Sequence, residues 1–233
     1  MNRRSALLVF AFVLTLFSSG AAATAAPSSP FGSVDFGSLG IPRVHGCSAE
    51  LHRPGDWRLG PKELSNVPPV GPQLAGYERT GGLNDEFFLG RWWDEKADPR
   101  PTWRYPEQGG YVIVDGKPLR AETTLEIGTL IDRYGGASGN YFAPAGTSYG
   151  ARALPPGNLT TDDKPENCNY HVYLVIKPLP VYTGPIADAF EQPGGGTQYE
   201  VTRETVKEEV RECGSTIDVT WLRCAHYLAL VFS

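Results

Sequence analysis

Few residues of this 233-residue chain have the types and spacing of a general acid-base or nucleophilic site. No Gly-x-Ser-x-Gly sequence occurs, so the nucleophile elbow of a hydrolase is absent. The four histidines neither exclude nor support a Ser-His-Asp triad. The acid pairs Asp85/Glu86 and Asp162/Asp163 resemble a glycosidase pair in residue type, but adjacent acids in polar loops are far more often solvated surface.

Phosphate and metal motifs are also missing from the sequence. The glycines at residues 194–196 are not followed by Gly-Lys-Ser/Thr, so they do not form a P-loop. No Cys-x-x-Cys or His-x-x-His spacing occurs, so the usual signature of structural zinc is absent. A net charge of -5 disfavours nucleic acid as a partner, because proteins that bind phosphate backbones need an excess of Lys and Arg.

Residues 1–25 have the pattern of a secretory signal peptide. Arg3 and Arg4 precede an apolar stretch at residues 6–17, and small residues follow, with Ala23-Thr24-Ala25 as the cleavage signature. The apolar stretch is too short to span a membrane, and no later stretch reaches the roughly 18 apolar residues that a membrane span requires. We therefore expect a secreted protein, extracellular or at the cell surface, with no transmembrane segment.

In a secreted chain, an even number of cysteines favours disulfides over a metal site. Three pairings of the four cysteines are possible. The short separation of Cys213 and Cys224 makes that bridge plausible and would leave Cys47 for Cys168, but the sequence does not decide between the pairings. Asn158-Leu159-Thr160 is an N-glycosylation pattern in a proline-rich stretch, which predicts a glycan at Asn158.

The composition is that of one globular domain with an appendage, since 41% of the residues are hydrophobic and 27 Gly and 20 Pro supply many turns. Residues 26–82 show short apolar islands without a sustained period, which predicts an irregular N-terminal arm or small subdomain. A dense apolar and aromatic cluster at residues 83–93 predicts a short buried helix or turn at the edge of the core.

Strand patterns follow from residue 111 onward. The run at residues 111–114 ends at the tight-turn pair Asp115-Gly116, and residues 169–177 alternate between two faces. Thr202 is predicted to cap a helix that ends near Arg211.

Residues 219–222 and 227–232 are predicted to be closing strands. Together the elements predict an α+β fold, in which a compact, twisted antiparallel or mixed sheet carries few short helices and is stabilised by disulfides.

A series of short motifs lies between residues 130 and 199. They are Leu130-Ile131-Asp132-Arg133-Tyr134-Gly135, Gly139-Asn140-Tyr141-Phe142, Pro144-Ala145-Gly146-Thr147, Arg152-Ala153-Leu154-Pro155-Pro156, Tyr170-His171-Val172-Tyr173, Lys177-Pro178-Leu179-Pro180, Gly184-Pro185-Ile186-Ala187 and the block at residues 190–199. In this order they resemble the tuberculosis necrotizing toxin (TNT) family of NAD glycohydrolases, and the predicted secretion resembles its fungal surface members. Upstream, Tyr105-Pro106 and Gly110-Tyr111 fit the same pattern. The similarity covers residues 83–201 as a core domain, and residues 202–233 are expected to pack on it.

The resemblance implies cleavage of the nicotinamide N-glycosidic bond of NAD, and also of NADP, by water to give nicotinamide and ADP-ribose. It assigns catalytic roles to Arg133, Gln198 and His171 and substrate-binding roles to Tyr141 and Arg152. No metal or other cofactor is implied for the chemistry. The fungal relatives suggest a homodimer.

The residue types suit this reaction. A guanidinium such as that of Arg133 can bind a diphosphate with two parallel charge-assisted hydrogen bonds. Because nicotinamide leaves as a neutral molecule, the reaction needs an oriented substrate and a placed water more than a strong acid, and the Gln198 amide can hold a ribose hydroxyl or that water. Taken singly, each residue has a simpler interpretation: Arg133 as a surface ion pair with Asp132, His171 as a structural histidine, and Gln198 as a turn residue.

Other functions stay open at this point. The same oxocarbenium-like centre could be captured by a side chain or by the adenine ring, as in an ADP-ribosyl transferase or cyclase, or the protein could be a secreted binding protein without turnover. Asp218, Glu208, Glu209 and Glu212 suggest calcium as a structural or regulatory ion, although a solvated helix face with pairs such as Glu208 and Arg211 is the simpler interpretation.

Overall fold

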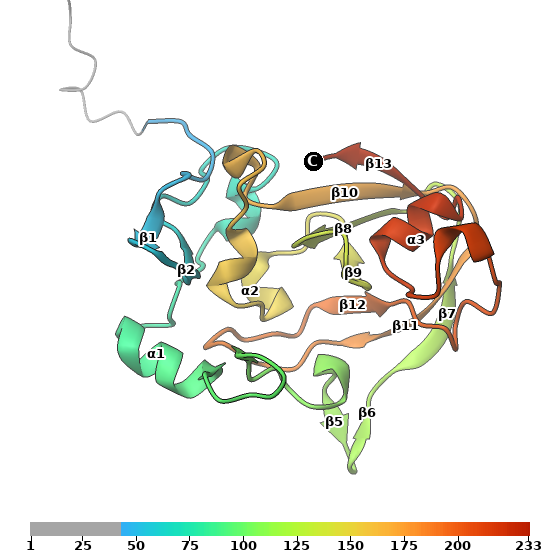
Figure 1. Cartoon of the computed structure of the whole chain (residues 1–233), viewed down its shortest axis with the longest axis horizontal. Helices are drawn as coiled ribbons and strands as arrows, with labels where there is room; N and C mark the ends of the chain where they lie inside the picture. Colours follow the sequence, from blue (N-terminus) through green and yellow to red (C-terminus); the bar gives the residue numbers. More distant parts are fainter. Residues whose placement is uncertain (1–42) are drawn as a thin grey trace, which may run out of the picture. The chain divides into compact units, whose positions relative to one another are not determined.

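The computed structural model describes residues 43–233 (Figure 1). The predicted signal peptide and the first part of the predicted arm lie outside the described residues. A seven-stranded sheet organises the described residues, in the order β13-β10-β8-β9-β12-β11-β7, and each pair of neighbours is antiparallel. The predicted α+β class is confirmed. The strands are β7 (Ala121–Leu125), β8 (Leu130–Tyr134), β9 (Tyr141–Pro144), β10 (Tyr170–Val175), β11 (Leu179–Pro185), β12 (Thr197–Glu200) and β13 (Leu228–Phe232).

Smaller elements surround this sheet. The hairpin of β5 and β6 turns at Asp115-Gly116 as predicted and projects at the bottom of Figure 1. In residues 43–233, no helix has the length and apolar character needed to cross a membrane. The two-stranded sheets and helices are β1 (Leu51–Arg53) with β2 (Asp56–Pro61), β3 (Trp93–Asp94) with β4 (Thr102–Trp103), β5 (Ile113–Val114) with β6 (Lys117–Pro118), α1 (Asp85–Trp92), α2 (Tyr149–Arg152), α3 (Val219–Cys224) and the 3-10 turns η2 (Gly71–Leu74), η3 (Gln108–Gly110), η4 (Pro156–Leu159), η5 (Pro165–Asn167) and η6 (Arg211–Cys213).

The two faces of the sheet pack against different parts of the chain. Successive residues of a strand point to opposite faces. On β8, Ile131 is fully buried in a core cluster that includes Trp221 of α3, whereas Tyr134 is buried in a second cluster with Tyr149 of α2. Leu74 of η2 belongs to this second cluster. The N-terminal segment, residues 43–82, therefore packs against the same side of the molecule as α2.

The predicted short helix near residue 83 is confirmed as α1. The Asn84 side chain accepts a hydrogen bond from the Phe87 backbone N–H at 2.9 Å, which satisfies one of the free donors at the helix start. Phe88 and Leu89 are buried, so α1 attaches to the core by one face.

The predicted helix at residues 202–211 is wrong. The Thr202 hydroxyl accepts hydrogen bonds from the Glu204 and Thr205 backbone N–H groups, but this makes a single turn. Side chains then compete for the backbone groups, because Arg203 donates to the carbonyls of Glu208 and Ser215 at 2.9 Å each. The segment continues without regular structure to η6.

Residues 219–222 form a helix rather than the predicted strand. Asp218 precedes α3, and its side chain accepts a hydrogen bond from the Trp221 backbone N–H at 2.8 Å. A short apolar run does not by itself distinguish a strand from a buried helix, and here the N-cap decides. The strand predicted at residues 227–232 is confirmed as β13.

Two disulfides cross-link the described residues. Cys213 bonds to Cys224 and Cys47 bonds to Cys168, which settles the choice that the sequence left open. The second bridge ties the N-terminal segment to the turn before β10. A backbone hydrogen bond from Cys47 to the carbonyl of Glu166 reinforces this attachment.

Candidate active site

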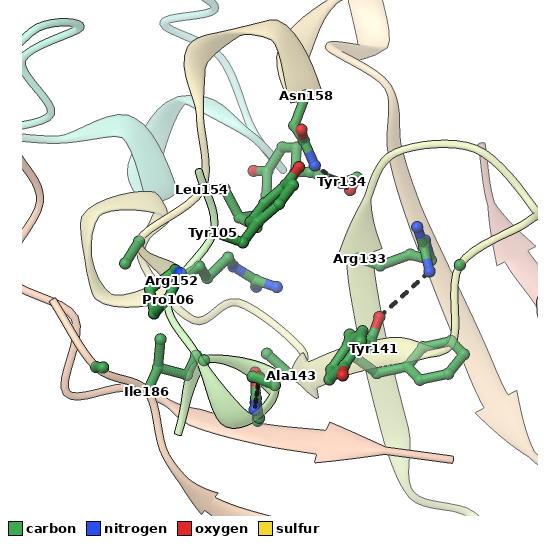
Figure 2. Close-up of a pocket in the computed structure, with 17 residues that line it drawn as sticks. Tyr105, Pro106, Arg133, Tyr134, Tyr141, Ala143, Arg152, Leu154, Asn158 and Ile186 are labelled. Carbon is green, nitrogen blue, oxygen red and sulfur yellow. Dashed lines mark hydrogen bonds between the residues drawn. The ribbon is translucent and has the colours of Figure 1, made fainter. Parts of the chain in front are cut away.

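A cavity of about 420 Å³ opens beside the middle of the sheet, within the size range of small-molecule sites. Arg133, Tyr141, Arg152 and Gln198 all line it. Figure 2 shows these walls, with Arg152 entering from the α2 side and Arg133 and Tyr141 together on the other side. Among the 17 residues that line the cavity there are two arginines and no Asp, Glu, Lys or His. The lining therefore contains positively charged side chains and no negatively charged one, in a chain of net negative charge.

Arg133 lies near the end of β8 and is held by backbone carbonyls. Its Nε donates to the Gly135 carbonyl at 3.2 Å and its Nη1 to the Tyr141 carbonyl at 3.3 Å. The guanidinium carbon lies 5.9 Å from the centre of the Phe142 ring. Burial lowers the pKa of Arg133, but an arginine stays charged near neutral pH. Its partners are uncharged, so the positive charge remains available to an anion.

The structure excludes the surface pair of Arg133 with Asp132, because adjacent strand residues point to opposite faces. Asp132 is fully buried and lies 2.6 Å from Arg152, between its Oδ1 and the guanidinium Nη2. Its Oδ2 accepts hydrogen bonds from the Tyr170 hydroxyl at 2.6 Å and the Gly146 backbone N–H at 2.8 Å. Burial raises the pKa of Asp132 above its usual value, and the opposing effects of Arg152, Tyr170 and Gly146 do not cancel this increase.

Arg152, the last residue of α2, is the more rigidly held of the two arginines. Its side chain is 4% exposed, its Nε donates to the Thr147 carbonyl at 3.0 Å, and its guanidinium carbon lies 5.3 Å from the centre of the Tyr134 ring. Its Nη1 forms no hydrogen bond with any residue from 43 to 233. Arg152 thus presents one edge of its guanidinium to the cavity while the other edge is bound to protein.

Gln198 and Tyr141 form the wall of the cavity on β12 and β9. Gln198 lies opposite Gly184 in the sheet, is 8% exposed, and donates from Nε2 to the Gly109 carbonyl at 2.8 Å. The Tyr141 hydroxyl donates to Oε1 of Glu200 at 2.9 Å, and burial together with Glu200 raises the pKa of Tyr141. Gln198 is therefore a buried strand residue at the cavity rather than a turn residue, and Tyr141 presents an uncharged ring.

His171 is the predicted site residue that the structure does not bring to the cavity lining. It lies on β10 directly opposite Arg133 in the strand register, with its Nε2 3.3 Å from Oδ1 of Asn169. Burial, followed by the charge of Arg133, lowers the pKa of His171. His171 is thus a neighbour of Arg133 and not a wall of the cavity.

Two features of the cavity were not assigned from the sequence. Tyr105 and Gly109 line it from the stretch before β5, where the Tyr105-Pro106 and Gly110-Tyr111 motifs gave a signal but no role. Asn158 also lines the cavity and donates from Nδ2 to the Tyr134 carbonyl at 3.2 Å. Glycosylation of Asn158 stays a prediction, and it would leave Nδ2 with one N–H for this hydrogen bond instead of two.

The acidic residues near the C-terminal part do not assemble a cation site. Asp218 caps α3, and Glu208 pairs with Lys177 and accepts a hydrogen bond from the Tyr227 hydroxyl at 2.7 Å. From residue 43 onward, no group of three or more His, Cys, Asp or Glu side chains could hold a metal ion. The geometry gives the calcium hypothesis no support, and the predicted helical pair of Glu208 with Arg211 is wrong.

Most residues of the cavity lining lie in a part of the chain that matches a known protein family. Residues 124–227 match the family model described as Tuberculosis necrotizing toxin. The resemblance inferred from the motifs is confirmed. The matched residues, here called the TNT region, contain Arg133, Tyr141, Arg152, His171 and Gln198, whereas the N-terminal segment lies outside them.

A curated relative and a solved structure are similar to the chain. The conidial surface nicotinamide adenine dinucleotide glycohydrolase nadA of Aspergillus fumigatus is 42% identical over 146 residues, which span 62% of this chain and 62% of the relative. The chain thus matches less than two thirds of that protein's length. A structure of tuberculosis necrotizing toxin complexed with its immunity factor IFT aligns with a TM-score of 0.48 and 21% identity, covering 63% of this chain and 71% of the other.

Proposed function

We propose that the protein is a secreted or cell-surface NAD glycohydrolase, which uses water to cleave the nicotinamide N-glycosidic bond of NAD. The observation that carries this proposal is the charge of the cavity, where two guanidiniums and no carboxylate form the walls. A dinucleotide has a diphosphate that such a site can bind. The A. fumigatus relative, named as a glycohydrolase of nicotinamide adenine dinucleotide, points to the same reaction.

The substrate is expected to span the cavity with its diphosphate at the arginines. Arg152 can bind the diphosphate through its Nη1, and Arg133 can attract it through its positive charge. The ring of Tyr141 gives an apolar face against which a planar group can pack. The Gln198 amide, which donates to the Gly109 carbonyl, is expected to bind a ribose hydroxyl or the attacking water. Holding both reactants in this way can supply several kcal/mol of the barrier reduction.

The bond that breaks joins the pyridinium nitrogen to C1′ of the ribose, and its electron pair goes to the nitrogen. Nicotinamide then leaves uncharged, and the water oxygen bonds to C1′ and releases a proton to give ADP-ribose. The departure requires no general acid, which agrees with a lining whose titratable groups are only tyrosines and arginines. We propose that His171 acts on Arg133 as a positioning residue instead of contacting substrate.

The test is incubation of the purified protein with NAD in the presence of a chelator, followed by identification of the products. Free nicotinamide and ADP-ribose support hydrolysis, whereas labelled protein or cyclic ADP-ribose would indicate a transferase or cyclase, and intact NAD a binding protein. Gln198→Ala, Arg133→Ala and Arg152→Ala are each expected to lower turnover by at least 100-fold. Gln192→Ala, at a buried glutamine outside the cavity lining, is the control.

Two further parts of the proposal concern substrate range and assembly. NADP is expected to be cleaved as well as NAD, which the same assay measures. A homodimer is expected in solution, which sedimentation velocity measures.

A further inference from the structure

Gln73 is a buried polar residue of the N-terminal segment that reaches the cavity residues from outside the TNT region. It lies on η2 and is 4% exposed. Its Nε2 donates to the Pro69 carbonyl at 3.0 Å. Its Oε1 accepts hydrogen bonds from the Tyr134 hydroxyl at 3.1 Å and from Nη2 of Arg152 at 3.4 Å. Both ends of the amide are therefore engaged, and the oxygen connects two residues that line the cavity.

The contacts of Arg152 determine the orientation of its guanidinium in the cavity. A guanidinium is planar, so fixing Nε and Nη2 also fixes the direction of Nη1. The Thr147 carbonyl holds Nε, and Asp132 holds Nη2 from the sheet. Asp132 contacts Nη2 as an ion-pair partner, whereas Gln73, 79 residues from Arg152 in the sequence, accepts a hydrogen bond from it. The direction in which Nη1 meets a ligand thus depends on an acceptor from the N-terminal segment.

We propose that Gln73 is a positioning residue of the active site, which orients Arg152 and Tyr134 toward the diphosphate of the dinucleotide. The inference rests on the proposed function. It gives the N-terminal segment a part in the site, because Gln73 reaches Arg152 only while that segment packs against α2 and is tied by Cys47–Cys168. Gln73 acts through Arg152 and touches no substrate.

The test compares Gln73→Met with Gln192→Met. Gln192 is also a buried glutamine, 6% exposed, and also links the core to the N-terminal segment, since its Nε2 donates to the Glu78 carbonyl at 2.8 Å. Gln73→Met is expected to lower kcat/KM for NAD by about 10-fold or more, the usual range for a lost hydrogen bond to a charged group. Gln192→Met is expected to leave it within about 2-fold. In an Arg152→Ala background, Gln73→Met should cause no further loss.

A second variant separates orientation from packing. Gln73→Glu keeps an oxygen that accepts from Tyr134 and Arg152, but it replaces the donor to Pro69 with a second carboxylate oxygen and adds a negative charge. If Gln73 positions Arg152, the Glu variant retains more activity than the Met variant. If Gln73 only fills space, the uncharged Met is tolerated better, and this result would overturn the proposal.

Binding of ADP-ribose, measured by calorimetry on the same variants, separates this inference from the proposed function. If the wild-type protein cleaves NAD and Gln73→Met behaves as Gln192→Met, Gln73 has no positioning role and the function stands. If the wild-type protein binds ADP-ribose without cleaving NAD, a weaker affinity of Gln73→Met alone still supports the role of Gln73. If it neither cleaves nor binds, both proposals are overturned.

Discussion

Gly139 lies against the guanidinium of Arg133 so closely that no side chain fits between them. A Cβ at residue 139 would overlap Nη1 and Nη2 of Arg133, well inside van der Waals contact. Gly139→Ala must therefore displace the arginine from its place at the cavity. We expect weaker binding of NAD, seen as an increase in KM of about 10-fold or more in steady-state kinetics. The thermal unfolding midpoint should change little.

The same loop supplies the control for this substitution. A Cβ at Gly136 would meet nothing within 4 Å, so Gly136→Ala should leave KM unchanged. Equal kinetics for the two alanine variants would show that the position of Arg133 is not needed for binding.

Tyr141 is expected to act through its ring. Its hydroxyl is bound to Glu200, whose second oxygen accepts from Arg120 at 2.7 Å. Tyr141→Phe removes one hydrogen bond within the protein, worth about 1 kcal/mol of folding stability, and keeps the ring, so kcat/KM should fall by no more than about 5-fold. Tyr141→Ala removes the ring and should cost clearly more. A Phe variant as impaired as the Ala variant would assign the role to the hydroxyl.

The pH profile of the reaction should be flat between about pH 7 and 9. Burial raises the pKa of Tyr105 to about 12 and also raises the pKa of Tyr134 and of Tyr141 above the usual value. The two arginines of the lining stay charged. No group of the lining thus changes its charge in this range, and kcat/KM for NAD measures this directly. A bell-shaped profile centred in this interval would require an acid or base that we have not assigned.

His171 should make the protein less stable in acid. Its pKa is lowered by burial and by Arg133, so below about pH 6.5 the unfolded chain takes up a proton at this residue more readily than the folded protein does. The free energy of unfolding contributed by neutral His171 is complete above that pH and decreases as the pH falls. Urea unfolding at pH 5 and pH 7.5 should show a smaller decrease for His171→Gln. His226→Asn, at an exposed histidine with a φ of 57°, is the control, and an equal decrease in both variants would contradict the expectation.

The two disulfides should differ in what they stabilise. Cys47–Cys168 spans 121 residues and Cys213–Cys224 spans 11. By loop entropy, their removal should cost about 5 and about 3 kcal/mol of unfolding free energy, which urea titration of the paired Cys→Ser variants measures. Only loss of the longer bridge frees the segment that carries Gln73, so only that variant should also lose NAD cleavage under conditions where both are folded.

Sequence patterns correctly predicted the strands and turns whose conformation is determined by residues close together in the sequence. The alternating residues of β10, the Asp115-Gly116 turn and the apolar run of β13 all appear as expected. The predicted helix at 202–211 failed because Arg203 bonds to Ser215, a partner 12 residues away, and a propensity rule considers no such partner.

The residues of the candidate active site could be predicted from the sequence only in part. The motifs indicated five residues, of which the structure brings Arg133, Arg152, Tyr141 and Gln198 to the lining of one cavity and leaves His171 outside it. They did not indicate that Asp132 pairs with Arg152, because that pairing depends on how β8 packs against α2. Gln73 lies in a stretch without any periodic pattern, and its contacts come from tertiary packing alone.

The strands that carry Arg133, Tyr141 and Gln198 occupy consecutive interior positions of the sheet, each with a neighbour on both sides. Their amide protons should be among the last to exchange with deuterated solvent, while those of the outermost strands β7 and β13 should exchange early. Gly109 and Gly139 line the cavity from outside these strands, so any movement that accompanies entry of a dinucleotide is expected in their loops rather than in the strands beneath it.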